Sequence, residues 1–197
     1  MPALVTAATR VLRLTFLPAR RALDVIDEGL EIDFAAYGHE CLFAGRLRLD
    51  ADRLTDMLNS TDELDLVDVV GLGLDGGIVE ADRVSVSRGE LVAVKAGDPR
   101  GRPSLRRPTR QVAVAAGSGR YLMYGYIHGR PGADPLIHVG RRPPMIPLTD
   151  ATIAYDTPNG WKHDDASTLI INRDTADWLR LAKEDELARL VRRWGAA

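Results

Sequence analysis

The sequence repeats itself at a spacing of about 80 residues, and this feature constrains the fold more than any other. Residues 42–48 (LFAGRLR) resemble residues 122–128 (LMYGYIH), with a leucine and a glycine at matching places. Residues 66–70 (LVDVV) likewise resemble residues 148–152 (LTDAT). Because self-similarity at a fixed spacing indicates a structural unit that occurs twice, we expect a duplicated domain.

The segments around these matches also agree in kind. Alternating apolar residues precede each match, and a glycine turn and a second β-rich stretch follow it. In the later stretches, Ser87-Arg88 and Asn172-Arg173 would occupy the same place. The sequence therefore predicts five parts: an N-terminal segment (1–29), a first small β domain (30–96), an Arg/Pro/Gly linker (97–109), a second small β domain (110–182) and a C-terminal helix (183–197).

Alternation with a period of two predicts a mainly β fold. We expect two tandem units of five short strands each, barrel-like, with the content of SH3-like, Sm-like or OB-like barrels. Val84, Val86, Leu91 and Val94 would form the final hairpin of the first unit.

Two helices are expected. Apolar residues spaced three and four apart (Leu54, Met57, Leu58) predict one short helix in the first unit, capped by Asp50 or Asp52. In the second unit, the prolines of residues 129–145 exclude a regular helix at the same place. An amphipathic helix over 183–197 would end the chain, with acids at its start and arginines near its end.

The net charge of −2 hides a strong polarity along the chain. Residues 22–98 hold 6 basic and 18 acidic residues, whereas residues 99–142 hold nine arginines and one aspartate. Proline and glycine keep the linker extended and exposed. It could bind an anion, lie across the protein's own acidic unit, or be a solvated connector. The candidate anion- or partner-binding residues are Arg100, Arg102, Arg106, Arg107, Arg110, Arg120 and Arg130, with Tyr124 and Tyr126 as stacking platforms.

No motif predicts catalysis. The chain has no nucleophile elbow, phosphate-binding loop or helical zinc-site spacing, so we expect no catalytic residue, no cofactor and no metal. The single cysteine excludes an intrachain disulfide and fits a reducing compartment. Arg10 and Arg13 interrupt the N-terminal apolar stretch, and no apolar run is long enough to span a membrane. We therefore expect a cytoplasmic protein without a membrane span.

Residues 45–77 carry the pattern G-x-L-x-L, RLTDxLN and L-x-L-x-D, with a weaker echo at 143–156. The matching residues are Gly45, Leu47, Leu49, Arg53, Leu54, Asp56, Leu58, Asn59, Leu64, Leu66 and Asp68. In this the chain resembles bacterial domains grouped as domain of unknown function 6812. The resemblance implies a small β-rich module that is often a component of something larger, and it brings no activity or cofactor.

Arg53, Asp56 and Asn59 recur every three residues, so they can share one helix face. That face would either fix the helix to the β domain or form a contact surface.

Our leading hypothesis is a non-catalytic bacterial interaction or assembly protein, self-associating or binding a protein partner through charge-complementary surfaces. The alternatives are a nucleic-acid-binding module that uses the linker and the second unit, and a small-molecule-binding or catalytic barrel.

Overall fold

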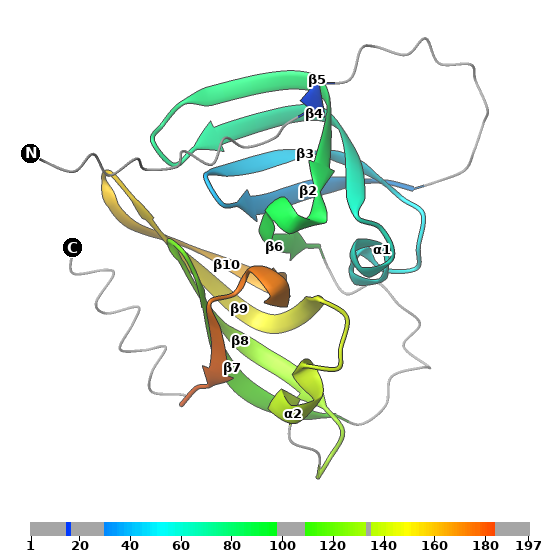
Figure 1. Ribbon diagram of the computed structural model, residues 1–197, viewed down its shortest axis with the longest axis vertical. Helices are drawn as coiled ribbons and strands as arrows, with labels where there is room; N and C mark the ends of the chain where they lie inside the picture. Colours follow the sequence, from blue (N-terminus) through cyan, green and yellow to red (C-terminus); the bar gives the residue numbers. More distant parts are fainter. Residues whose placement is uncertain (1–14, 17–29, 98–108, 133–134, 184–197) are drawn as a thin grey trace, which may run out of the picture.

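The computed structural model describes residues 15–16, 30–97, 109–132 and 135–183. They form a mainly β protein, as the sequence predicts. Eleven antiparallel strands make one sheet in the order β1-β5-β4-β3-β2-β6-β10-β9-β8-β7-β11 (Figure 1). The sheet is open, and two separate barrels are not seen. The reason is that β6 pairs with β10 rather than closing its own unit, so the two halves become one sheet.

The first half alternates buried and exposed side chains along its strands. In β2, for example, Phe34 and Ala36 are buried while Glu31 and Asp33 are exposed. Its elements are β2 (Leu30–Gly38), β3 (Cys41–Leu49), α1 (Leu54–Ser60), β4 (Glu63–Gly73), β5 (Ile78–Ser87), the 3-10 turn η1 (Arg88–Glu90) and β6 (Leu91–Ala96). A two-residue strand, β1 (Thr15–Phe16), pairs with β5 at the edge of this half.

The second half has the same order of elements. They are β7 (Arg110–Ser118), β8 (Tyr121–Gly129), α2 (Pro135–Val139), β9 (Met145–Thr157), β10 (Gly160–Asn172), the 3-10 turn η3 (Arg173–Thr175) and β11 (Trp178–Leu181). Each element lies 80 to about 87 residues after its counterpart, so the spacing seen in the sequence recurs in three dimensions.

The halves share irregularities as well as strands. The β3–β4 register shifts beside Gly45, and the β8–β9 register shifts beside Gly125. On the neighbouring strands, Asp68 (φ 52°) and Asp150 (φ 46°) adopt left-handed backbone conformations, which aspartate tolerates better than most residues. These paired β-bulges bend both halves at the same place.

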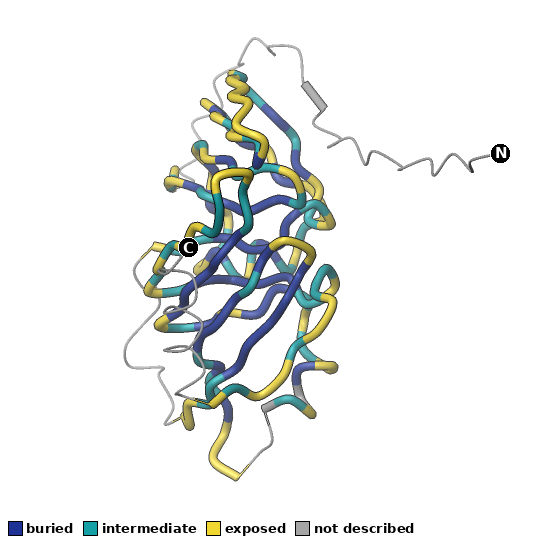
Figure 2. Tube along the Cα trace, turned by 90° about the vertical axis from the view of Figure 1, so that its left-hand side faces the viewer, coloured by how far each residue is buried: buried dark blue, intermediate teal, exposed yellow. Residues whose placement is uncertain are grey.

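Two apolar cores cross the boundary between the halves. The core of the first half includes Met145 and Ile170 from the second. The core of the second half includes Tyr37, Val92 and Ala93 from the first. Seen from the side, buried residues run along the strands while exposed residues gather at the turns (Figure 2). Each half therefore contributes apolar side chains to the core of the other.

Several local expectations need correction. β5 and β6 do not form a hairpin, because β5 pairs with β4 and β1 while β6 pairs with β2 and β10. Helix α1 forms where the apolar spacing predicts it, but Arg53 is its N-cap and no side chain caps it. The carboxylate of Asp50 instead accepts a hydrogen bond from Arg48.

The second half contains a helix that the sequence argument excluded. Helix α2 starts at Pro135, a place where proline is tolerated because the first turn of a helix needs no N–H donor. The C-terminal helix expected at 183–197 lies outside the described residues except at its first position. Within the described ranges, no helix has the length and apolar character of a membrane span.

Candidate functional site

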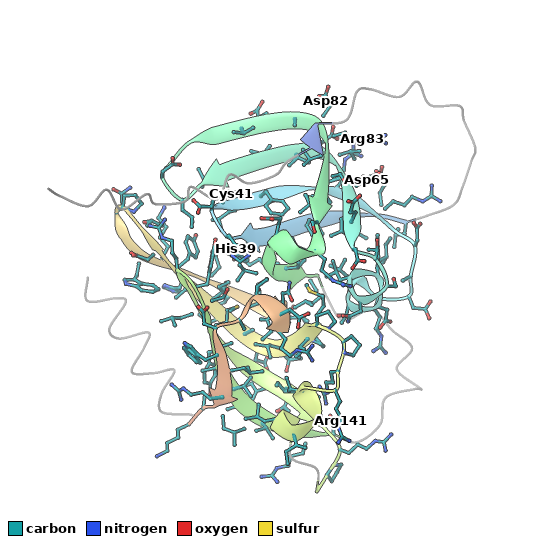
Figure 3. All side chains as sticks on the ribbon, in the orientation of Figure 1. His39, Cys41, Asp65, Asp82, Arg83 and Arg141 are labelled. Atoms are coloured by element: carbon teal, nitrogen blue, oxygen red, sulfur yellow. The ribbon has the colours of Figure 1, made fainter. Side chains whose placement is uncertain are left out.

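A polar cleft of about 650 Å³ lies where the two halves meet. Its walls come from equivalent places in the repeat: the turns after β2 and β7, and the 3-10 turns η1 and η3. Figure 3 labels His39, which belongs to the first of these turns. The lining residues are His39, Asp62, Ser87, Arg88, Gly89, Ser118, Gly119, Asn172, Asp174, Thr175 and Asp177.

An arginine in each half anchors the end of a short helix. The guanidinium of Arg88 donates to the carbonyl oxygen of Thr61 (3.2 Å), just past the end of α1, and to the carboxylate of Asp62 (2.5 Å). The guanidinium of Arg173 donates to the carbonyl oxygens of Val139 and Arg142 (both 2.7 Å), at the end of α2. Cations favour helix C-termini because unpaired carbonyl groups gather there.

Two asparagines join the halves, and one of them, Asn172, lines the cleft. Asn59 of α1 makes two hydrogen bonds with the backbone of Met145, one accepted from its N–H (2.9 Å) and one donated to its carbonyl (3.0 Å). Asn172, only 3% exposed, donates to the carbonyl oxygens of Arg88 (3.1 Å) and Leu91 (3.0 Å). Each amide thus satisfies backbone groups of the opposite half.

The acids of the cleft make hydrogen bonds within their own half. Asp177 accepts from the N–H of Gly119 (2.8 Å), and Asp174 accepts from Arg173 (2.9 Å). In the described part of the chain, no buried side-chain nitrogen or oxygen lacks a hydrogen-bond partner, and no three metal-ligating side chains are grouped to hold a metal ion. The asparagines therefore hold the halves together, whereas the acids stabilise the turns around the cleft.

A tyrosine cluster also joins the two halves. The rings of Tyr37, Tyr121 and Tyr155 approach one another with centroids 5.9–6.2 Å apart. The Tyr37 hydroxyl donates to the carboxylate of Asp164 (2.7 Å), and the Tyr121 hydroxyl donates to the carbonyl of Gly38 (2.6 Å). Burial raises the pKa of Tyr37 and Tyr121 above the ordinary value, and Asp164 raises that of Tyr37 further.

This cluster predicts a loss of stability in alkali. Above about pH 10, tyrosines of the unfolded chain ionise while Tyr37 and Tyr121 stay protonated in the folded chain, so stability falls as pH rises. One such tyrosine contributes up to ~1.4 kcal/mol per pH unit. Urea unfolding at several pH values between about 8 and 11 measures the slope, which Tyr37→Phe should reduce. An unchanged slope in Tyr37→Phe would contradict the role assigned to Tyr37.

The described residues divide their charge unevenly between the halves. Residues 30–97 hold 6 basic and 14 acidic residues, whereas residues 109–132 and 135–183 hold 9 basic and 6 acidic ones. Exposed acids on β4 and β5 with no ion pair among the described residues form what we call the acidic patch: Glu63, Asp65, Glu80 and Asp82. Three exposed arginines of the second half form the basic patch: Arg110, Arg130 and Arg141.

The two patches lie at opposite ends of the molecule. Figure 3 places Asp65 and Asp82 at the end formed by β4 and β5, and Arg141 beyond α2 at the other end. Arg110 and Arg130 belong with Arg141, because Arg110 pairs with Gly129 and α2 packs on β8. The long axis of the protein therefore carries an electrostatic dipole.

The predicted anion-binding residues are only partly brought together. Arg100, Arg102, Arg106 and Arg107 lie outside the described residues. Arg110 and Arg130 are neighbours on β7 and after β8, whereas Arg120 lies in the turn at the other end of those strands; all three are exposed. Tyr124 is 2% exposed and its ring meets that of Tyr126 edge-on (centroids 6.0 Å apart), so Tyr124 offers no free ring face for stacking.

The three residues predicted to share one face of α1, Arg53, Asp56 and Asn59, differ in their contacts. Asn59 fixes α1 to β9 through the backbone of Met145, while Arg53 and Asp56 are exposed. Of the two interpretations offered for this face, anchoring describes Asn59, and a contact surface remains open to the other two.

Sequence reasoning missed the part played by Arg88, Asn172 and Arg173. The signal was present, because the repeat aligns Ser87-Arg88 with Asn172-Arg173. Ser87 and Asn172 each accept a hydrogen bond from the N–H two residues later, at 3.3 and 3.1 Å, so the two 3-10 turns start alike. The backbone N–H of each arginine also bonds to a matching carbonyl, that of Asp62 or Pro144.

Comparison with known proteins gives no match: no family model, no curated protein and no solved structure is similar to this chain at a significant level.

Proposed function

We propose that this protein is a non-catalytic interaction protein that associates with its partners through charge-complementary ends. The observation that carries the proposal is an apolar surface bordered by the acidic patch, on the outer face of the β4–β5 hairpin. Val70 is 48% exposed, Leu72 40% and Ile78 69%. Val70 lies directly opposite Glu80, and Leu72 opposite Ile78, so the apolar side chains and this acid share one face.

The repeat supplies an internal comparison for this face. The second-half positions that correspond to Val70 and Leu72 are Thr152 and Ala154, which are 7% and 0% exposed. A face that is buried in one half is therefore exposed in the other, although its side chains are larger and more apolar. Exposed apolar side chains grouped beside charges are typical of contact surfaces.

The dipole indicates the chemistry of the partner. A partner for the β4–β5 end should be basic with an apolar surface, and one for the α2 end should be acidic. A second copy of this chain meets both charge requirements, because its α2 end is basic and its β4–β5 end is acidic. Complementary charges of this kind mainly set orientation and association rate. A reducing cytoplasm is part of the proposal, supported by the single thiol of Cys41.

Light scattering of the wild-type protein at low and high salt tests the proposal. At about 50 mM salt we expect an average mass above that of one chain, and at about 500 mM salt the mass of one chain, because salt screens exposed charges. A monomer that is insensitive to salt would contradict charge-driven self-association.

Charge reversal makes the test specific. One variant carries Asp65→Lys, Glu80→Lys and Asp82→Lys, and a second carries Arg110→Glu, Arg130→Glu and Arg141→Glu. We expect each variant alone to associate less than wild type, and an equimolar mixture of the two to recover association. The control is Asp52→Lys, which reverses an exposed acid near α1 that belongs to neither patch and should change little. Recovery failing in the mixture would show that the two patches do not meet.

Among the described residues, the nucleic-acid alternative rests on the basic patch and on the half-buried Tyr126, because Tyr124 is buried. The linker arginines that it also uses lie outside the described ranges. Titration with a labelled single-stranded oligonucleotide at about 50 mM salt separates the alternatives. Binding that is lost in the Arg110, Arg130 and Arg141 variant would favour the nucleic-acid function over protein association.

A further inference from the structure

The joint between the two halves is an antiparallel pairing of β6 with β10. Val94 lies opposite Ile170, and Lys95 lies opposite Leu169. The first four residues of β6 and the last four of β10 are buried, and the paired backbone groups continue the sheet from one half into the other. The joint therefore shows how one copy of the repeated unit adds to the next.

The two strands of this joint, β6 and β10, each have a counterpart near one end of the sheet. β11 is the counterpart of β6, because Trp178 pairs with Gly117 as Ala93 pairs with Tyr37. β5 is the counterpart of β10. Among the residues that the structure describes, no strand pairs with the outer edge of β11. The N–H of Ala182, just after β11, donates to the carbonyl oxygen of Ala113 on β7. In the antiparallel alternation, the N–H groups of Leu179 and Leu181 therefore point away from β7.

The β5 edge carries β1 at the place where the joint would form. Thr15 pairs with Ser85 and Phe16 pairs with Val84. Ser85 and Val84 lie 85 residues before Ile170 and Leu169, the offset that also relates Ser87 to Asn172. β1 therefore occupies on β5 the position that β6 occupies on β10. Both pairs, β1 with β5 and β6 with β10, are antiparallel.

We propose that β1 caps the β5 edge against head-to-tail addition of a second copy of this chain through its β11. The inference rests on the proposed function, since it names a second copy as the partner. In the capped protein, complementary charges allow only a weak encounter between ends. With β1 displaced, β11 of the next copy would pair with β5 as β6 pairs with β10, continuing the sheet between molecules.

The charge layout favours this direction of assembly. The β5 edge belongs to the acidic end, and β11 belongs to the second half, which carries the basic patch. Because the β5 edge and the β11 edge are different surfaces, each added copy would leave one free β5 edge and one free β11 edge at the ends of the assembly. Unprotected edges of this kind are what natural β proteins cover, and β1 is such a cover.

The test disrupts β1 in the full-length chain with Thr15→Pro and Phe16→Pro, since proline removes the N–H that an added strand needs. At a concentration where wild type is monomeric, this variant should form dimers and larger species, with a self-association Kd at least ~10-fold lower than that of wild type. The matched control, Thr15→Val with Phe16→Leu, retains a strand-forming segment and should behave as wild type.

Two further measurements identify the surfaces. Adding Leu181→Pro to the β1 variant removes an outward N–H of β11 and should restore the wild-type mass, whereas Leu181→Ala should not. Amide hydrogen exchange should show slower exchange at residues 178–181 in the assembled variant than in the monomer. A peptide with the sequence of residues 11–20, added in excess, should compete with β11 and reduce the mass.

A β1 variant that stays monomeric, with circular dichroism like that of wild type, would overturn the inference. So would an assembly that Leu181→Pro and the peptide both leave intact, including aggregation of a misfolded variant. These failures differ from failure of the proposed function, which is judged on wild-type and charge-reversed proteins with β1 in place.

Discussion

Replacing Ile170 with alanine should lower the free energy of unfolding of the whole protein by about 2–5 kcal/mol. Ile170 is 0% exposed and belongs to β10 of the second half, yet its side chain lies in the core of the first half. The cavity would therefore weaken packing on the far side of the joint. Urea unfolding gives the size of the effect, with no change expected in the slope of the transition.

Two probes decide whether the halves unfold together. Of the three tryptophans, the two in the described residues, Trp161 of β10 and Trp178 of β11, belong to the second half, so their fluorescence reports on that half. The only cysteine, Cys41, is half-buried in β3, so its reactivity with a thiol reagent reports on the first half. We expect both probes to shift to the same lower midpoint in Ile170→Ala, as in a two-state transition.

Ile137→Ala is the matched control for this substitution. Ile137 is 67% exposed on α2, so the same change of side chain should alter stability by less than about 0.5 kcal/mol. Separate midpoints for fluorescence and thiol reactivity in Ile170→Ala would contradict a shared core and show two independent folding units.

Gly45→Ala should destabilise the protein by about 1–3 kcal/mol. A Cβ at Gly45 would lie 2.9 Å from the carbonyl oxygen of Val67 and 3.1 Å from Cγ2 of Val69. The first of these atoms belongs to the backbone of the bulged strand β4, so it cannot rotate away. Thermal or urea unfolding measures the loss, and fluorescence should remain native-like below the transition.

Gly71→Ala provides the control, because Gly71 lies in β4 close by and a Cβ there meets only the carbonyl oxygen of Val79, at 3.7 Å. Removing a glycine without strain should leave stability unchanged or raise it by up to about 1 kcal/mol. Equal effects at the two positions would show that loss of glycine flexibility, rather than crowding at the bulge, governs the result.

The glycine pair also shows how far the sequence could lead. Gly45 and Gly125 defined the repeat, and the structure gives the reason: each lies where a neighbouring strand bulges, at Asp68 or Asp150, too close for a side chain. Period-two alternation likewise predicted the strands. Local patterns of this kind are set by neighbours that the sequence itself contains.

What the sequence did not predict depends on contacts over long distances. Val84–Val94 reads as a hairpin, yet the turn η1 leads β6 across to β2 and β10, because pairing partners are chosen by the whole sheet. Helix α2 was excluded by counting prolines, although Pro135 stands where a helix tolerates one. The arrangement of the two halves also decides which apolar strand faces stay exposed, such as the one that holds Val70 and Leu72.

In the candidate site, too, local features could be predicted from the sequence and long-range contacts could not. The repeat placed Ser87-Arg88 and Asn172-Arg173 at equivalent positions, but their bonds to helix ends and to the opposite half need three-dimensional proximity. Tyr124 and Tyr126 were expected to be stacking platforms, and their rings meet each other edge-on. That Tyr124 is buried, and so unsuited to stacking, follows from packing that alternation alone does not describe.

The place of β6 in the sheet has a consequence for synthesis of the chain. Leu91, Val92, Ala93 and Val94 are all 0% exposed, and β10 supplies the neighbouring strand. On the ribosome, residues 30–96 emerge first and must wait for residues 160–172 before β6 gains its second partner and Ile170 fills the first core. At 5–20 residues per second, this leaves an apolar strand edge open for seconds, a period in which chaperones can engage the nascent chain.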